Sequence, residues 1–91
     1  MNKLVSIITA SFNSSQFIED CIDSVISQTY NTWELLIVDD CSSDNSSELV
    51  EKYSDKRISL IVLEKNVGSS EARNIAIRKA KGKYIAFLDA D

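Results

Sequence analysis

Two carboxylates stand two residues apart, Asp89 and Asp91, directly after the apolar run YIAFL. Side chains at positions i and i+2 of an extended segment point the same way, so these acids repel unless a cation lies between them. Mg²⁺ and Mn²⁺ bind one or two carboxylates and complete their coordination with substrate phosphates and water. The pair therefore predicts a divalent metal site, with a solvated acidic terminus as the alternative.

A second pair of acids, Asp39 and Asp40, follows the apolar run ELLIV. A carboxylate at the end of a buried run can accept a hydrogen bond from a ligand, and a ligand that lacks the donor leaves it unpaired, at about 1–3 kcal/mol. We assign this binding role to Asp40 and expect a structural role for Asp39. The alternative for both is an ordinary loop or helix-capping acid.

Two further side chains complete the candidate set. Phe12 lies in the polar segment ASFNSS, where an aromatic ring either stacks on a flat base or plugs the core. Arg73 falls in the first turn of a predicted helix, where a cation opposes the helix dipole. Such a cation often has an anionic partner, either a ligand phosphate or one of the aspartates. The alternative is a surface arginine, and the sequence leaves both pairs of alternatives open.

Seven elements are needed to position these side chains. The apolar runs predict strands over 4–9, 34–38, 57–64 and 83–88, and the amphipathic segments predict helices over 16–28, 44–53 and 69–81. Continuous apolar runs are typical of parallel strands covered on both faces, and we expect the last run to be buried as well. The order βαβαβαβ indicates an α/β fold with a parallel sheet flanked by helices. Because ligands bind beyond the carboxyl ends of such strands, we expect the candidate residues to meet there.

Local signals predict how the helices begin, end and pack. Ser15 is the expected cap of the first helix, Ser69 or Ser70 caps the third, and Gly82 ends the third. The first helix carries one apolar stripe, made of Phe17, Ile18, Cys21, Ile22, Val25 and Ile26. The residues of the third helix expected to face inward are Ala72, Ile75, Ala76 and Ala80.

The composition narrows the function classes. The 91 residues suffice for one domain, and a net charge of −4 without a basic patch argues against duplex nucleic acid as a partner. Without histidine, the sequence excludes Ser-His-Asp and Cys-His catalysis and histidine-bound zinc. Cys21 and Cys41 are expected to be reduced, in a cytoplasmic protein. Lys52, Lys56 and Arg57 are expected on a solvated face.

Several segments together carry a family resemblance. VSIITASFN, SVISQTYNTWELLIVDDCSSDNS and NVGSSEARNIAIRKAKGKYIAFLDAD resemble, in order and spacing, the family-two glycosyltransferases of the GT-A fold. The resemblance implies a Rossmann-like nucleotide-binding half that binds a nucleotide-diphosphate sugar, usually a UDP-sugar, with Mn²⁺ or Mg²⁺. It also implies a saccharide or lipid-linked saccharide as acceptor, a role in bacterial cell-surface polysaccharide synthesis, and at most a peripheral association with the membrane.

The resemblance also implies roles for the candidate residues by position. Phe12 corresponds to the aromatic that stacks on the base, and Asp40 to the aspartate that binds the pyrimidine edge. Arg73 corresponds to an arginine near the base and the diphosphate. Asp89 and Asp91 correspond to the D-x-D pair, the first near the ribose and the second on the metal, with Asp89 as a further metal ligand.

Three positions depart from the family pattern. Ala10 replaces a proline, Phe12 stands where a tyrosine is frequent, and Cys41 replaces the glycine of D-D-G-S. None of these changes removes a charge, and an aromatic ring is kept for stacking. The departures therefore leave the class of donor unchanged and the identity of the sugar open.

The resemblance covers only part of a family-two enzyme. Residues 1–91 correspond to the donor-binding part of the domain, up to the D-x-D pair, and the general base of an inverting transfer is expected in residues beyond them. We therefore expect no transferase activity from this segment, and self-association through the open edge of its fourth strand. Two alternatives remain open, namely a metal-dependent phosphotransfer or phosphatase-like domain and a non-catalytic nucleotide-binding module.

Overall fold

A computed structural model describes residues 3–90, while residues 1, 2 and 91 lie outside the described part. The elements are β1 (Val5–Ser11), α1 (Ile18–Ser27), β2 (Trp33–Asp39), α2 (Ser46–Glu51), β3 (Ile58–Val62), α3 (Ser69–Lys79) and β4 (Tyr84–Phe87). This order confirms the predicted alternation of strands and helices. Within residues 3–90, no helix is long and apolar enough to cross a membrane.

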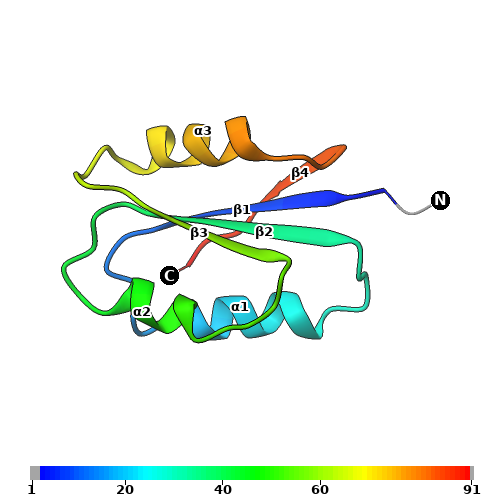
Figure 1. The fold of residues 1–91 in the computed structure, drawn as a ribbon, viewed down its shortest axis with the longest axis horizontal. Helices are drawn as coiled ribbons and strands as arrows, with labels where there is room; N and C mark the ends of the chain where they lie inside the picture. Colours follow the sequence, from blue (N-terminus) through cyan, green and yellow to red (C-terminus); the bar gives the residue numbers. More distant parts are fainter. Residues whose placement is uncertain (1–2, 91) are drawn as a thin grey trace.

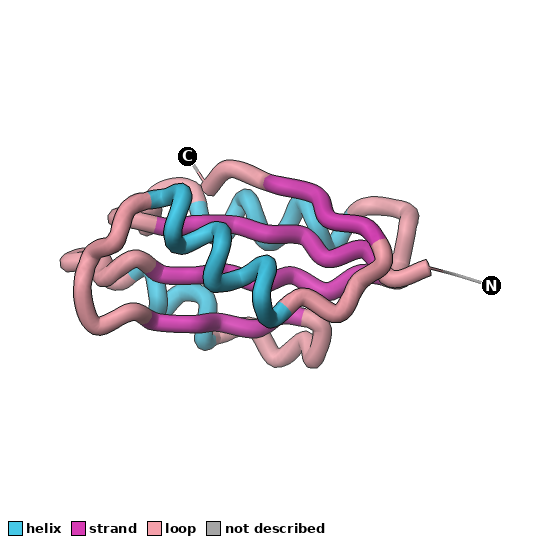
Figure 2. Tube along the Cα trace, turned by 90° about the horizontal axis from the view of Figure 1, so that it is seen from above, coloured by secondary structure: helices cyan, strands magenta, loops and turns pink. Residues whose placement is uncertain are grey.

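The strands form one parallel sheet in the order β3-β2-β1-β4 (Figures 1 and 2). The chain moves outward from β1 to β2 and β3, crosses back through α3, and adds β4 on the other side of β1. The strand order thus reverses beside β1, which is where parallel α/β sheets bind ligands. All carboxyl ends point to one edge of the sheet, the left-hand end of the molecule in Figure 1.

Helices cover both faces of the sheet, with α1 and α2 on one side and α3 on the other (Figure 1). Because side chains alternate along a strand, Leu35 and Ile37 pack against α1 and α2, whereas Leu36 and Val38 pack beneath α3. All four side chains are buried. Burial on both faces explains why β2 is an unbroken apolar run, and it confirms the prediction for this strand.

Small residues bring α3 close to the sheet. Ala72 and Ala76 are fully buried, and Ile75 and Ala80 pack beside them, as predicted. Gly82 does not end the helix, because α3 stops at Lys79 and continues into an extended Ala80.

Gly82 serves a packing purpose instead. A Cβ atom there would lie 2.5 Å from the Ser6 hydroxyl oxygen and 2.7 Å from the Ser6 nitrogen. The Gly82 N–H donates a hydrogen bond of 2.8 Å to the same hydroxyl. The glycine therefore lets the chain approach β1 closely just before β4 begins.

The expectation of a buried fourth strand is wrong. Tyr84, Ile85 and Phe87 of β4 are 49%, 41% and 58% exposed. β4 pairs with β1 on one side only and lies at the edge of the sheet (Figure 2). An apolar run indicates a strand but does not say whether a neighbour covers it, so the burial could not be read from the sequence. The open edge itself is present as expected.

The predicted caps of α1 and α3 are also wrong. The Ser14 carbonyl accepts hydrogen bonds from the N–H groups of Phe17 (2.9 Å) and Ile18 (2.8 Å), so α1 begins at Ile18 without a cap from Ser15. Gly68 precedes α3 with φ of 93°, a conformation that favours glycine, and its position leaves Ser69 as the first helical residue.

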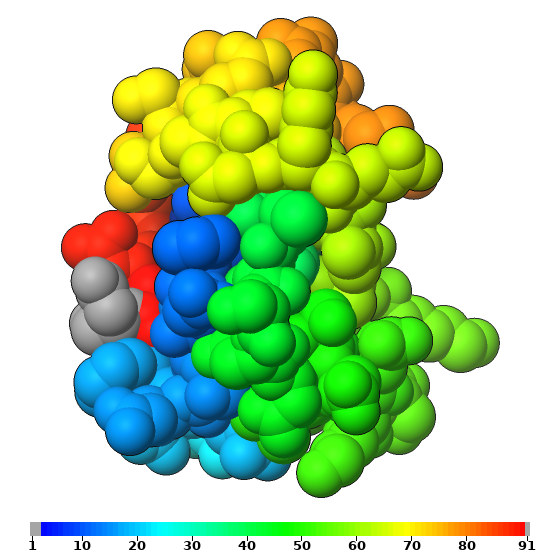
Figure 3. All heavy atoms as spheres, turned by 90° about the vertical axis from the view of Figure 1, so that its left-hand side faces the viewer, coloured from blue at the N-terminus to red at the C-terminus, as the bar shows by residue number. Residues whose placement is uncertain are grey.

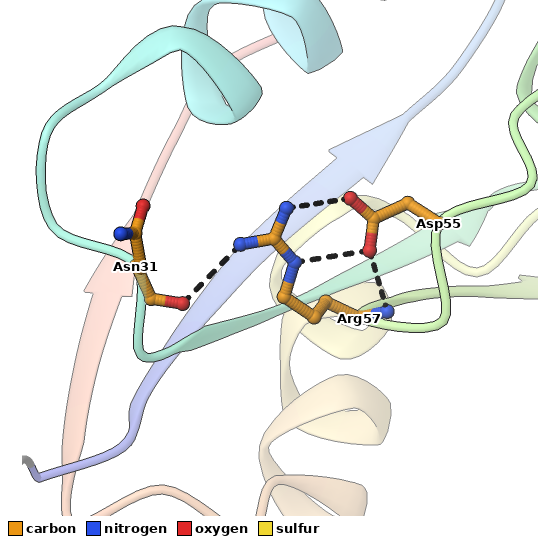
Figure 4. A network of polar contacts seen from close by, with 3 residues as sticks. All are labelled: Asn31, Asp55 and Arg57. Carbon is orange, nitrogen blue, oxygen red and sulfur yellow. Dashed lines mark hydrogen bonds and ion pairs between the residues drawn. The ribbon is translucent and has the colours of Figure 1, made fainter.

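A polar network joins the loops at the amino ends of β2 and β3 (Figure 4). The Arg57 guanidinium lies 3.8 Å from the centroid of the Trp33 ring and donates hydrogen bonds to both carboxylate oxygens of Asp55 and to the Asn31 carbonyl. These bonds lower the pKa of Asp55 to about 2. Arg57 therefore has a structural role although its side chain is 36% exposed, whereas Lys52 and Lys56 are exposed as predicted. Arg57 lies at the edge of the sheet opposite the candidate residues.

Candidate functional site

The segments that follow the four strands meet at the carboxyl edge of the sheet. Figure 3 views this edge directly and shows the end of β1 (blue), the segment after β2 (green), the segment leading into α3 (yellow) and the segment after β4 (red) around one another. The rule that ligands bind at this edge therefore correctly predicted that the candidate residues within 3–90 gather there.

Two adjoining pockets open on this edge. The first has a volume of about 290 Å³, and its lining includes Phe12, Asp40, Asn66, Gly68 and Ser69. The second has a volume of about 580 Å³, and its lining includes Phe12, Phe17, Ser69, Arg73 and Asp89. Phe12 and Ser69 belong to both pockets, so one extended ligand can occupy the two together. The described part of the candidate set thus lines one continuous site.

Phe12 follows β1 directly and is 52% exposed. This exposure excludes the alternative of a core plug, because its ring is not part of either apolar cluster. The exposed ring stands between the two pockets, where a flat heterocycle can stack on it. The stacking role itself remains a prediction.

Asp40 is the most strongly held residue of the site. Its side chain is only 3% exposed, and its N–H donates a hydrogen bond of 2.8 Å to the Ser11 carbonyl of β1. Oδ1 accepts from the Val67 N–H at 2.8 Å, and Oδ2 accepts from the Gly68 N–H at 2.9 Å and from Asn66 Nδ2 at 3.0 Å. An ionised carboxylate has about four acceptor positions, so these three bonds leave capacity for a ligand donor.

Asp39 points to the other side of the sheet. Its carboxylate accepts hydrogen bonds from the Ser42 hydroxyl at 2.6 Å and the Ser42 N–H at 3.1 Å. It is buried and is not among the residues that line the two pockets. These bonds shape the loop after β2, which agrees with the structural role expected for Asp39.

The same loop is tied to the loop after β1. The Ser43 N–H donates to Asn13 Oδ1 at 2.8 Å, and the Ser15 N–H donates to Asp44 Oδ2 at 3.1 Å. The hydroxyl of Ser46 also donates to Asp44, and this bond is the main reason that the pKa of Asp44 falls to about 2. The bonds hold in place the two loops that flank the site.

Both cysteines are free thiols, as predicted. Cys21 is buried, and this burial raises the pKa of its thiol, whereas Cys41 is exposed in the loop after β2. Cys41 has φ of 62°, in the left-handed region that favours glycine. The departure from the D-D-G-S pattern therefore places a side chain where the backbone suits glycine better.

Arg73 and Asp89 lie next to each other in the lining of the second pocket. Arg73 Nη2 lies 3.8 Å from Asp89 Oδ1, and the two side chains are 37% and 78% exposed. An ion pair this open contributes about 0–1 kcal/mol, so either group can engage a ligand instead. Ser69 and Arg73 both belong to the first turns of α3, whose amino-terminal N–H groups favour an anion. Of the two partners expected for Arg73, the structure supplies an aspartate.

The metal prediction is only partly accessible to the structure, because Asp91 lies outside the described residues. Within residues 3–90, no three histidine, cysteine, aspartate or glutamate side chains converge to hold a metal. Asp89 offers one exposed carboxylate at the pocket. Mg²⁺ and Mn²⁺ need only one or two carboxylates when phosphates supply further ligands, so the donor set fits such an ion. The metal site remains a prediction.

Two lining residues were missed from the sequence. Phe17 was assigned to the apolar stripe of α1 but precedes the helix, is 46% exposed and lines the second pocket. Ile26, from the same predicted stripe, is 38% exposed. Asn66 follows the third predicted strand and so was expected at the carboxyl edge, but no binding role was assigned to it. Its hydrogen-bond partner lies 26 positions away in sequence. A polar loop residue carries no signal that identifies so distant a partner.

Comparisons with known proteins agree with this geometry. The family model described as glycosyl transferase family 2 matches residues 6–91. The chain is 50% identical over 88 residues to the UDP-Glc:alpha-D-GlcNAc-diphosphoundecaprenol beta-1,3-glucosyltransferase WfgD of Escherichia coli, covering 97% of this chain and 35% of that protein. It is 41% identical over 87 residues to the succinoglycan biosynthesis protein ExoO of Rhizobium meliloti, covering 96% of this chain and 25% of that protein.

Solved structures show the same fold. TarS 1–349 of S. aureus in complex with UDP-GlcNAc is 34% identical, with a TM-score of 0.91 over 96% of this chain and 26% of that chain. The mannosyltransferase PcManGT of Pyrobaculum calidifontis, in complex with GDP-Man and Mn²⁺, is 29% identical, with a TM-score of 0.88 over 96% of this chain and 27% of that chain.

The chain therefore spans between 25% and 35% of the length of the proteins that it resembles here. The family model nevertheless matches nearly all of its residues, and the sheet order and the two pockets agree with the predicted Rossmann-like, nucleotide-binding fold. The chain belongs to glycosyl transferase family 2 and forms the amino-terminal, nucleotide-binding part of a GT-A domain.

Proposed function

We propose that this segment forms the donor site of a glycosyltransferase that moves a sugar from a UDP-sugar to an acceptor hydroxyl. The observation that carries the proposal is the pair of adjoining pockets, which brings an exposed aromatic ring, a buried carboxylate and a solvent-exposed ion pair into one site. Support comes from TarS, which was solved with UDP and with UDP-GlcNAc.

The two pockets suit the two ends of such a donor. In the first, the base stacks on Phe12 and donates its ring N–H to Asp40, the buried acceptor. In the second, the diphosphate lies toward Arg73 and the amino terminus of α3, and the ribose toward Asp89. Because Phe12 belongs to both pockets, the base and the diphosphate stay within one continuous ligand.

Asp89 and Asp91 would hold a Mn²⁺ or Mg²⁺ ion together with the donor diphosphate. When bound, such an ion neutralises the negative charge that develops on the leaving diphosphate. The proposal is supported by the exposed carboxylate of Asp89 and by PcManGT, which was solved with GDP-Man and Mn²⁺. Arg73 and the N–H groups of α3 add positive charge at the same place.

The transfer inverts the anomeric carbon. The acceptor oxygen bonds to that carbon as the bond to the diphosphate oxygen breaks, and a carboxylate outside residues 1–91 takes the acceptor proton. Residues 1–91 contribute donor binding and leaving-group stabilisation only, so we propose that they have no transferase activity by themselves. Sugar transfer by the 91-residue chain at a rate close to that of a full-length relative would contradict this.

We further propose that the acceptor is a saccharide or a lipid-linked saccharide in cell-surface polysaccharide synthesis. The name of WfgD gives alpha-D-GlcNAc-diphosphoundecaprenol as its acceptor, and ExoO is named for succinoglycan biosynthesis. We propose that the protein is cytoplasmic. We also propose that it acts peripherally at the membrane surface, because polyprenol-linked acceptors lie at a membrane.

The open edge of β4 supports a proposal about assembly of this 91-residue chain. Tyr84, Ile85 and Phe87 are exposed on a strand that pairs on one side only. Unpaired backbone beside exposed apolar side chains favours strand addition, so we propose self-association through β4. Light scattering at rising concentration is expected to show dimers or larger species, and a monodisperse monomer throughout would contradict the proposal.

Calorimetric titration tests the donor site. UDP and ADP are each titrated into the chain with Mn²⁺ present, after circular dichroism has established that the chain is folded. We expect UDP to bind and ADP to bind at least tenfold more weakly, because a purine is larger and presents a different hydrogen-bonding edge to Asp40. Equal affinity for both, or no binding by the folded chain, would count against the proposed function.

A further inference from the structure

The side chain of Asn66 is exposed and does not pack in the core, but it hydrogen-bonds Asp40 at two points. Its Nδ2 donates hydrogen bonds to Asp40 Oδ2 at 3.0 Å and to the Asp40 carbonyl at 3.1 Å. We propose that Asn66 is a positioning residue, which fixes the orientation of the Asp40 carboxylate and thereby the selectivity for the base. This inference rests on the proposed function, since it takes the first pocket to be the base site.

Both hydrogen bonds that the Asn66 NH₂ group donates go to Asp40. An asparagine NH₂ group has two N–H donors, and both are directed at Asp40, one to its side chain and one to its main chain. A side chain bonded at two points of the same residue resists rotation about χ1 and χ2. The Asp40 carboxylate is therefore held against its own backbone.

The next two residues of the loop complete the clamp. The N–H groups of Val67 and Gly68 bond to Oδ1 at 2.8 Å and to Oδ2 at 2.9 Å. Gly68 has φ of 93°, and no heavy atom lies within 4 Å of the position a Cβ would take. The glycine is thus required by backbone conformation and not by space, because with this φ the chain turns from the loop that contacts Asp40 into α3.

The burial of the two partners separates positioning from packing. Asp40 is buried, whereas Asn66 is exposed. Replacing Asn66 removes little buried surface, so its loss acts on the partner that it holds. Without Asn66 the carboxylate keeps only its two bonds to main-chain N–H groups. The acceptor position that faces the first pocket is then held less firmly, and a base that donates one N–H binds more weakly.

The substitution Asn66→Asp tests this with a pH readout. It sets a second carboxyl group about 3 Å from that of Asp40, and like charges so close raise one pKa of the pair. When the new group is protonated, its O–H replaces the lost N–H bond, and when ionised it repels Asp40. We expect the variant to bind UDP at least tenfold more weakly than the wild type at pH 8, and to recover most of that loss at pH 5.

The matched control is Asn45→Asp, which adds the same charge at an exposed residue before α2 with no side-chain capping bond. We expect its UDP affinity to follow that of the wild type at both pH values. If Asn66→Asp binds UDP as the wild type does at pH 8, or shows no recovery at pH 5 while remaining folded, the positioning role is overturned.

Amide hydrogen exchange gives a second measurement that needs no ligand. In Asn66→Ala we expect the N–H groups of Val67 and Gly68 to exchange at least tenfold faster than in the wild type, because the Asp40 carboxylate that accepts from them is no longer anchored by Asn66. Unchanged exchange would refute the clamp. If wild-type chain fails to bind UDP yet Asn66→Ala releases these amides, the clamp stands and the assignment of the pocket to a base fails.

Discussion

The substitution Asp40→Asn probes the site with the least change in shape. The carboxylate accepts one N–H at Oδ1 and two at Oδ2, and an amide keeps only one oxygen. In the better of its two orientations, the amide oxygen takes the place of Oδ2, and the NH₂ group meets the N–H of Val67 without an acceptor. The worse orientation loses two bonds, so the minimum loss is one charge-assisted hydrogen bond.

The magnitude follows from burial. A hydrogen bond to a charged group contributes about 1.5–3 kcal/mol, and the side chain is too well buried for water to replace it. The remaining bonds weaken as well, because they become neutral. We expect the free energy of unfolding to fall by about 2–3 kcal/mol, which for a domain of this size lowers Tm by roughly 8–24 °C.

Urea unfolding followed by circular dichroism measures this loss, and calorimetry under conditions where the variant is folded measures UDP binding. We expect the affinity for UDP to fall at least tenfold. The amide has only one oxygen, which is neutral and already accepts from protein N–H groups, so the ring N–H of the base has a weaker acceptor. The control is Asp20→Asn on the exposed face of α1, expected to change stability by less than about 0.5 kcal/mol. A stability and a UDP affinity equal to those of the wild type in Asp40→Asn would refute the reasoning.

Four further predictions follow from single features. Phe12→Ala is expected to weaken UDP binding by about 1–3 kcal/mol in calorimetry through lost stacking, without a change in fold. Gly82→Ala is expected to destabilise the chain by about 1–3 kcal/mol in urea, because its Cβ would lie 2.7 Å from a backbone nitrogen. Cys41→Gly is expected to stabilise it by about 1 kcal/mol, since φ there is 62°. In the folded chain the pKa values of Asp44 and Asp55 fall to about 2, below the unfolded value near 3.9. The stabilisation that they provide is therefore complete above about pH 4 and is lost as the pH falls to about 2. Measuring the free energy of unfolding at a series of acid pH values checks this.

The sequence predicted those features that depend on patterns within one segment. Unbroken apolar runs identified the strands, and their alternation with amphipathic segments established a parallel sheet. The rule for the carboxyl edge then brought Phe12, Asp40, Arg73 and Asp89 to one place, as the two pockets confirm. No distant contact was needed for these steps, because parallel topology alone decides which loops share an edge.

Several of the failures involve contacts between distant segments. Gly82 follows α3 as a helix-ending glycine would, but its backbone is set by Ser6, and the pairing joins the two ends of the chain. Arg57 was expected on the surface because it is charged, but its guanidinium stacks on the ring of Trp33. Asn66 holds Asp40 from a loop whose course depends on Gly68. Such partners follow from the folded arrangement and leave no periodic trace in the sequence.

The central claim is that the carboxyl edge of the sheet binds the nucleotide of a sugar donor. Chemical-shift mapping of the ¹⁵N-labelled chain with UDP and Mg²⁺ tests it most directly, because each backbone amide gives its own signal and so reports binding near it separately. We expect the amides of Phe12, Asp40 and Arg73 to shift with one common affinity, and the amide of Arg57 at the opposite edge to stay in place. Shifts concentrated around Arg57, or none in a folded chain at saturating UDP, would contradict the account.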